Sequence, residues 1–164
     1  MVKSGPRITV RGHNRAYRNL VRNAARWMVC DLMNHRLSDT LTIRIKLVKD
    51  LLKSECIYGD CEWTDDNRRP KEFTVRLYAG PSRKRTLKTL AHELIHVKQF
   101  ARRELYDHIM NADLVTWKGQ RVDSQQVSYE DHPWEKEAYE MEKPLLNRWA
   151  QATGNDKYLW RSNR

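Results

Sequence analysis

The sequence lacks a long apolar run and an apolar leader, and it contains few cysteines. No stretch of about 18 apolar residues occurs, so a membrane-spanning helix is not expected. The first residues, Met1 to Arg7, contain no apolar segment of the kind that directs secretion. The three cysteines are odd in number and lack Cys-x-x-Cys spacing, which is typical of reduced thiols in the core of a cytoplasmic protein. We therefore expect neither a membrane partner nor a disulfide scaffold.

Acidic residues are also in short supply. The chain has 31 Lys and Arg residues against 21 Asp and Glu, a formal net charge of +10, and the excess is concentrated before residue 54. Five arginines of this region recur at helical spacing: Arg11, Arg15, Arg18, Arg22 and Arg26. Such a stripe is expected to bind the phosphates of DNA or RNA, with strong salt dependence and little reading of base sequence. The alternative is a solvated basic face that only keeps the protein soluble.

The length and the aromatic content indicate one folded domain. A chain of 164 residues with 40% hydrophobic content can bury a core of its own, and six Trp and seven Tyr argue against disorder. No internal repeat, low-complexity tract or linker divides it. We expect a single domain over residues 1–164, with 1–13 and 155–164 as loose basic ends, and the sequence indicates no particular oligomeric state.

Period-two alternation predicts the strands. Residues 42–48 alternate as a half-buried strand does, and further strands are expected over 56–64 and 71–79. The segment between the last two is rich in turn-forming residues, so these strands are expected to pair as a hairpin. The strand over 71–79 directly precedes a helix, and we expect it to be the edge with which an extended substrate pairs.

Helical periodicity predicts three long helices, over about 14–36, about 86–101 and from Pro133 onward. The connector over about 104–132 has a tight-turn signal at 117–120, and a connector of this length is often functional. The expected fold class is therefore α+β: an N-terminal helix, a three-stranded and mostly antiparallel sheet, and two helices after it.

The helix expected over 86–101 contains an H-E-x-x-H motif, His92-Glu93-Leu94-Ile95-His96. Residues four apart lie about 5–6 Å apart on one helical face, so both imidazoles can bind one metal ion with Glu93 beside it. The histidines lie nearly opposite the stripe that packs on the core, which comprises Leu87, Leu90, Ala91, Leu94, Val97 and Ala101. The pattern predicts a single Zn²⁺ site; the alternative is a pair of surface histidines.

A hydrolytic zinc site with two imidazoles needs a third protein ligand and a position for water. The metzincin class is excluded, because it requires Gly and His where this chain has Gln99 and Arg102. The last helix offers Glu135 and Glu137, which flank its apolar stripe on opposite sides, so periodicity does not choose between them. Cys61 is a further alternative, because peptide deformylases take a Cys from an upstream strand, but their Gly-rich signature is missing here.

The two motifs together resemble the gluzincin pattern, in which H-E-x-x-H is followed by a ligand helix such as Glu135-Lys-Glu-Ala-Tyr139. Over about residues 40–150 the chain is similar to small SprT-like metallopeptidases and phage-type minigluzincins. The resemblance implies a zincin-like fold, His92, His96 and Glu135 as ligands of one Zn²⁺, and Glu93 as general base. A phage-encoded protein of this kind acts in the host cytoplasm. The chain departs from the family at Tyr139, where several gluzincins have Asp, and in lacking a Cys-rich zinc ribbon.

The expected function is a zinc metallopeptidase that acts on a polypeptide substrate. Glu93 is expected to deprotonate a metal-activated water and to pass the proton to the leaving amine. Tyr129, His132 and Tyr139 lie near the start of the last helix and are candidates to stabilise the oxyanion. The SprT-like resemblance adds nucleic-acid-associated proteins as a substrate class.

Two other classes of function stay open. One is a nucleic-acid-binding module with a structural zinc, for which a closed site with four protein ligands is expected. The other is a deformylase-like amide hydrolase, for which a cleft too short for a polypeptide is expected.

Overall fold

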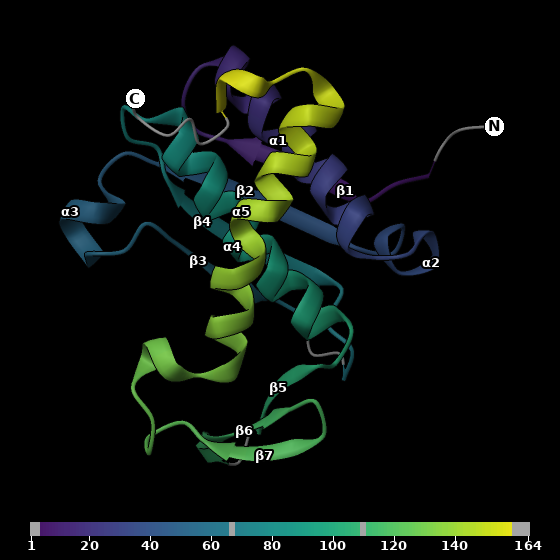
Figure 1. Cartoon of the computed structure of the whole chain (residues 1–164), viewed down its shortest axis with the longest axis vertical. Coiled ribbons are helices and arrows are strands. Elements are labelled where there is room, and N and C mark those ends of the chain that lie inside the picture. The colour runs from purple at the N-terminus through teal and green to yellow at the C-terminus, as the bar shows by residue number, and fades with distance from the viewer. Residues whose placement is uncertain (1–3, 66–67, 109–110, 159–164) are drawn as a thin grey trace.

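The chain folds as an α+β structure in which three long helices lie on one side of a mixed sheet (Figure 1). The computed structural model describes residues 4–65, 68–108 and 111–158. Within these ranges, the larger sheet has the strand order β1-β2-β4-β3, formed by β1 (Arg7–Arg11), β2 (Thr42–Val48), β4 (Glu72–Tyr78) and β3 (Gly59–Trp63). The long helices are α1 (Arg15–Leu32), α4 (Arg83–Ala101) and α5 (Pro133–Thr153).

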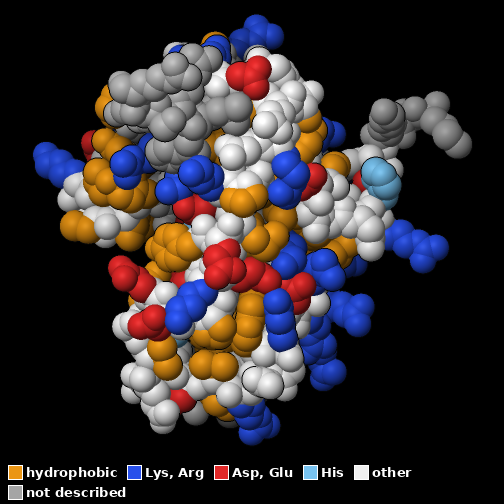
Figure 2. Space-filling view, in the orientation of Figure 1, with side chains coloured by type: hydrophobic (Ala, Val, Ile, Leu, Met, Phe, Trp, Pro, Cys, Tyr) orange, Lys and Arg blue, Asp and Glu red, His pale blue; other side chains and the backbone are white. Residues whose placement is uncertain are grey.

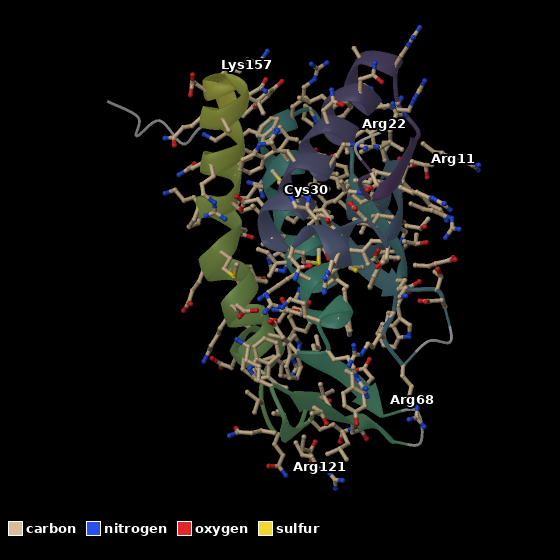
Figure 3. All side chains as sticks on the ribbon, turned by 90° about the vertical axis from the view of Figure 1, so that its right-hand side faces the viewer. Arg11, Arg22, Cys30, Arg68, Arg121 and Lys157 are labelled. Carbon is tan, nitrogen blue, oxygen red and sulfur yellow. The ribbon has the colours of Figure 1, made fainter. Side chains whose placement is uncertain are left out.

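The helices form two layers over the sheet. Helices α1 and α4 contact the strands, and α5 packs against α4, so α4 lies between the sheet and α5. Figure 3 shows this arrangement from the side, with α5 at the left-hand edge. Because α4 is covered from both sides, every residue from 90 to 101 is buried. The opposite face of the sheet stays open: along β2, Ile43, Ile45 and Leu47 are buried, whereas Arg44 and Lys46 are exposed.

The sheet differs from the expected three-stranded, mostly antiparallel one. β2 pairs in parallel with both β1 and β4, and only the β3–β4 pair is antiparallel within the described sheet. Parallel neighbours need a crossover connection, which α1 supplies between β1 and β2. The strand at 42–48 and the β3–β4 hairpin are confirmed, with β3 and β4 shorter than expected.

The expectation of a loose end over 1–13 is wrong for residues 7–11, which form β1. Ile8 and Val10 point into the core from this strand, which is only five residues long. Near the C-terminal end of the described residues, the ring of Tyr158 stacks on Trp149 at a centroid distance of 5.9 Å. Residues 1–3 and 159–164 of the expected loose ends lie outside the described residues.

The first expected helix is divided in two. Asn14 accepts a hydrogen bond from the Tyr17 backbone N–H and begins α1, which ends at Leu32. Asn34 caps the short helix α2 (His35–Ser38) in the same way. The cap at Asn34 therefore starts a new helix, although the apolar periodicity of the sequence continues through this position.

The connector between α4 and α5 has more structure than expected. It contains a small antiparallel sheet of β5 (Leu105–His108), β6 (Asn111–Trp117) and β7 (Gln120–Asp123), followed by the short helix η1 (Tyr129–Asp131). The predicted tight turn is confirmed, since Lys118 and Gly119 connect β6 to β7 with φ of 46° and 84°. Helix α3 (Leu51–Glu55) and the short helix η2 (Asp156–Tyr158) complete the fold. Among the described helices, none has the length and apolar character needed to cross a membrane.

Candidate metal centre

The H-E-x-x-H segment lies in the middle of α4. Ser82 begins this helix by accepting a hydrogen bond from the Arg85 backbone N–H. The apolar stripe of α4 faces the sheet and α1, and the opposite face, which carries His92 and His96, is covered by α5. The residues of both histidines are less than 9% exposed. They are therefore not surface histidines, and the carboxylates that face them come from α5.

Three ligand atoms converge between α4 and α5. The Nε2 atoms of His92 and His96 are 3.2 Å apart, and each is 3.2 Å from an oxygen of the Glu135 carboxylate. Tetrahedral ligands at zinc bond lengths of 2.0–2.1 Å are about 3.3–3.4 Å apart. Among the described residues, these three form the group whose ligand atoms could hold one metal ion. The spacing and the donor types both fit zinc.

The side chain of Gln99 determines which ring nitrogen of His96 carries hydrogen. Gln99 Nε2 donates to the Trp134 carbonyl oxygen at 3.0 Å and to Glu137 Oε2 at 2.8 Å, two groups that only accept. Gln99 Oε1 therefore faces His96 Nδ1, at 2.8 Å, and accepts its hydrogen. This contact leaves the lone pair of His96 on Nε2, directed at the other ligand atoms.

Glu142 contacts Nδ1 of His92, as Gln99 contacts Nδ1 of His96. Its Oε2 is 3.0 Å from His92 Nδ1, and its Oε1 is 3.0 Å from the Nζ of Lys88. A carboxylate behind a histidine fixes the ring orientation and makes the far nitrogen a stronger ligand. Both histidines therefore present Nε2 to Glu135. Without a metal ion these nitrogens can donate a hydrogen bond to the carboxylate, and a cation placed between the three groups would take the place of those protons.

The charges of the site favour the ionised forms of both His92 and Glu135. Burial lowers the pKa of His92, but hydrogen bonds to Glu135 and Glu142 outweigh this effect and raise the value to about 9. Burial raises the pKa of Glu135, but the two histidines more than reverse this effect and hold it well below its usual range. The site thus combines an ionised carboxylate with two histidines whose surroundings stabilise a positive charge.

The structure separates the two carboxylates that periodicity left open. Glu135 faces the histidines, whereas Glu137 accepts from Gln99 and forms ion pairs with Lys98 and Lys118, at 3.3 and 2.8 Å. Burial raises the pKa of Glu137, but the interaction with Lys118 and then those with Gln99 and Lys98 hold it below its usual value. Glu137 therefore stabilises the approach of α5 to α4 and does not join the ligand group.

Glu93 is buried beside the ligand group, with 6% of its surface exposed. Burial raises its pKa to about 7; His96 and His92 oppose the shift, and Glu135 adds to it. Gly59 lies opposite: a Cβ at this position would come within 2.9 Å of the Arg76 carbonyl oxygen and 3.3 Å of Glu93 Cγ. The absence of a side chain at Gly59 lets β3 approach α4 closely at the carboxylate.

A cleft of about 370 Å³ opens beside these groups. His92, Glu93 and Glu142 line it together with Tyr129 and Tyr139. The Tyr139 ring packs on His92 at a centroid distance of 4.8 Å. Burial, with Glu135 in addition, raises the pKa of Tyr129 well above its ordinary value, so its hydroxyl remains a hydrogen-bond donor.

The third candidate of this set, His132, lies elsewhere. Its ring stacks on Trp134 at 4.5 Å, and its Nε2 is 3.0 Å from the Ser124 carbonyl oxygen. His132 is buried and is not part of the lining of the cleft. These contacts support a structural role in the packing of the connector against α5.

The expected substrate edge is corrected by the strand order. β4 lies between β2 and β3 and has no free edge, whereas β3 is one of the two edge strands of the described sheet, the other being β1. Gly59, the first residue of β3, lines the cleft. The edge next to the candidate site is therefore β3, because the hairpin folds back on the outer side of β4.

Cys61 lies in β3, near Glu93, but it is not part of the metal-ligand group found among the described residues. Burial raises the pKa of its thiol well above the usual value, and Glu93 adds to the shift. The structure therefore favours Glu135, which belongs to the ligand group, over Cys61, which does not.

The arginine stripe is distributed over two elements. Arg11 belongs to β1, and the other four lie on α1, so the five do not share one helix. Figure 3 shows Arg11 and Arg22 projecting outward on the same side of the molecule. Arg11, Arg15 and Arg26 are exposed, and Arg18 and Arg22 are partly buried. Binding of nucleic acid by these residues stays a prediction.

Sequence reasoning missed Gln99 and Glu142 as partners of the histidines. Glu142 follows Glu135 by seven residues, which is two helical turns and places both carboxylates on one face of α5. Gln99 follows His96 by three residues and shares its face of α4. Both signals are present in the sequence, although they become specific only once the two helices are known to pack together.

Comparisons with protein-family models, with curated proteins and with solved structures give no match for this chain. The resemblance to small gluzincins therefore rests on the two motifs alone.

Proposed function

We propose that this chain is a zinc-dependent metallopeptidase that hydrolyses peptide bonds, with His92, His96 and Glu135 as the metal ligands. One observation carries the proposal: the three ligand atoms converge beside the buried Glu93, and both His92 and Glu93 line a cleft. A bound zinc ion would supply an acidified water molecule and polarise the scissile carbonyl. A purely structural site would give no reason for a buried carboxylate beside the ligands.

The residues around the site support this chemistry. Glu93 has a pKa of about 7, so near neutral pH it can take a proton from water and return it to the leaving amine. The Tyr129 hydroxyl, which stays protonated, is suited to donate a hydrogen bond to the oxyanion that forms at the carbonyl. Tyr139 packs on His92 and limits access of bulk water to that ring.

The position of β3 supports a polypeptide substrate. An extended peptide can add to a free sheet edge through backbone hydrogen bonds, and β3 is the free edge that begins at the cleft. Gly59 brings this edge next to Glu93. A peptide paired with β3 would therefore have its backbone close to the general base.

The rival classes are less well supported. A closed structural zinc site needs four protein ligands, and the group found in the described part of the chain has three. A deformylase-like site would include Cys61, which that group does not contain. The substrate class of nucleic-acid-associated proteins comes from the SprT-like resemblance and from the predicted arginine stripe, and the geometry adds no further support.

The test is hydrolysis of a mixture of internally quenched peptides by the zinc-loaded protein and by Glu93→Gln. Removal of a general base lowers the rate about 10²- to 10⁴-fold, while the ligands and hence zinc content are retained. Glu140→Gln is the matched control, because Glu140 is an exposed carboxylate on α5. Full activity of Glu93→Gln, or no hydrolysis by the zinc-loaded parent, would contradict the proposal.

A further inference from the structure

A second pocket lies at the C-terminal end of α4. It has a volume of about 490 Å³ and is bordered by α2, by the residues before β4 and by the residues that follow α4. Arg102 is ten residues beyond His92, about 15 Å along the helix axis. None of its lining residues is shared with the cleft of the candidate metal centre. The pocket is therefore a separate feature of the surface.

Its lining is strongly basic. Five of the ten lining residues are cationic, against 31 of 164 in the whole chain: Arg36, Arg69, Lys71, Arg102 and Arg103. No Asp or Glu is among its described lining residues. Figure 2 shows Lys and Arg side chains gathered at the right-hand edge of the molecule, level with this end of α4. Positive charges from three separate segments thus meet in one hollow.

Few carboxylates contact these cations within the described residues. Arg102 forms an ion pair with Glu104 at 3.3 Å, and the Asp65 carboxylate accepts a hydrogen bond from the backbone N–H of Lys71 at 3.1 Å. The positive charges of the lining therefore outnumber the carboxylates that are seen to contact them. Like charges held close together repel one another and destabilise the fold, and a bound anion removes that repulsion. The arrangement is therefore better suited to a ligand than to the empty pocket.

The backbone at Arg103 supports this interpretation independently. Arg103 has a φ of 55°, in the left-handed region, immediately after the C-cap of α4. Glycine is the usual residue there, because a side chain in this conformation is strained. The Arg103 guanidinium lies over the ring of Tyr106 at 5.1 Å, which orients it. A charged side chain is thus present at a position where the backbone alone favours glycine.

We propose that this pocket binds a compact anion that carries two or more phosphate groups, such as inorganic triphosphate or the triphosphate part of a nucleotide. Guanidinium groups match phosphate oxygens in a two-pronged geometry, and four of the five cations are arginines. No aromatic side chain is among the described lining residues, so stacking on a base does not contribute. The proposal does not depend on the metal centre or on peptide hydrolysis.

The experiment is calorimetric titration of the full-length protein with inorganic triphosphate, with ATP and with a 12-nucleotide single-stranded DNA at about 50 mM salt. The test variants are Arg36→Gln/Lys71→Gln and Arg103→Gly. The matched control is Lys49→Gln/Lys53→Gln, which removes the same charge beside and within α3, at the left-hand edge of Figure 1, whereas α2 lies at the right. Melting temperatures are measured for every variant.

We expect triphosphate and ATP to bind the parent with similar affinity, because the phosphates supply the recognition. Each lost cation should weaken binding about tenfold, so the double pocket variant should lose about a hundredfold and the double control less than about threefold. Arg103→Gly should bind about tenfold more weakly although its melting temperature is no lower than that of the parent. That combination separates lost binding from lost folding.

Three results would overturn the proposal. The first is no measurable binding of triphosphate by the parent. The second is an equal loss in the control and the pocket variant, which would assign the affinity to net charge alone. The third is binding of the oligonucleotide through the pocket residues without binding of triphosphate, which would assign the pocket to a nucleic-acid strand.

Discussion

Replacement of Glu142 by Gln tests whether the carboxylate behind His92 strengthens the metal centre. Glutamine keeps the size of the side chain and still offers an oxygen to His92 Nδ1, but it removes the negative charge. A hydrogen bond to a charged group contributes about 1.5–3 kcal/mol and a neutral one about 0.5–1.5 kcal/mol, so the change is about 1–1.5 kcal/mol. We therefore expect the zinc Kd of Glu142→Gln to rise about tenfold.

The ion pair with Lys88 does not account for such an effect. The Lys88 side chain is 36% exposed, and an ion pair of that exposure contributes about 0–1 kcal/mol. Lys88→Gln is therefore the control that removes this contact while leaving the Glu142 carboxylate on His92. Its zinc Kd should stay within about threefold of the parent value.

Competition with a chromophoric chelator measures the zinc Kd of each variant, and circular dichroism verifies the fold. Glu135→Gln and Glu137→Gln give the reference values of the zinc Kd. The first alters a ligand, and the second alters only the contacts with Gln99, Lys98 and Lys118. Zinc should be lost from the first and retained by the second. An unchanged Kd in Glu142→Gln would refute the assigned role, and the opposite result for Glu135 and Glu137 would transfer the ligand to Glu137.

The remaining predictions concern pH and salt. The pKa of His92 is raised from 6.5 to about 9. In the metal-free protein, the stabilisation of the fold by protonated His92 is therefore fully present below pH 6.5 and is lost as the pH rises through 9. The melting temperature of the metal-free protein should fall over this range, by an amount equivalent to at most about 3 kcal/mol, and zinc should largely abolish the fall; a pH-independent value would contradict the assigned contacts. If the arginines predicted from the sequence contact phosphates, each Arg→Gln change should reduce the slope of log affinity for DNA against log salt by about one, whereas a solvated face would show no slope. Cleavage of a basic DNA-binding protein should then rise when DNA is added.

The parts of the fold that could be predicted are those with a local signal. The strand over 42–48 alternates strictly, and the H-E-x-x-H helix has an unbroken apolar stripe. β1 has the same alternation in Ile8 and Val10, but it is only five residues long and its partner β2 begins more than 30 residues later. A pairing of this kind is decided by tertiary contacts, and so is the parallel direction of the sheet.

The connector shows the same limit. Its turn at Lys118 and Gly119 was predictable, because two consecutive residues with positive φ need a residue such as glycine. β7 is short and largely exposed, and among the described side chains of β6 only Val115 is buried. The sequences of the two strands carry no strong alternation. Strands of that kind are stable only through the sheet they form together.

The third ligand shows why spacing alone was insufficient. Glu135 and Glu137 are about 200° apart around α5, so each faces a different neighbour, and only the packing of α5 on α4 decides which one meets the histidines. The choice follows from charge as well as geometry. Lys98 and Lys118 lie on the Glu137 side and supply it with two cations, whereas Glu135 is given two imidazoles. A carboxylate already paired with two lysines is a poorer metal ligand, and a carboxylate that faces two imidazole nitrogens gains most from a cation between them. The residues around α4 therefore assign the two glutamates to different tasks: one holds the helices together, and the other completes the candidate zinc site.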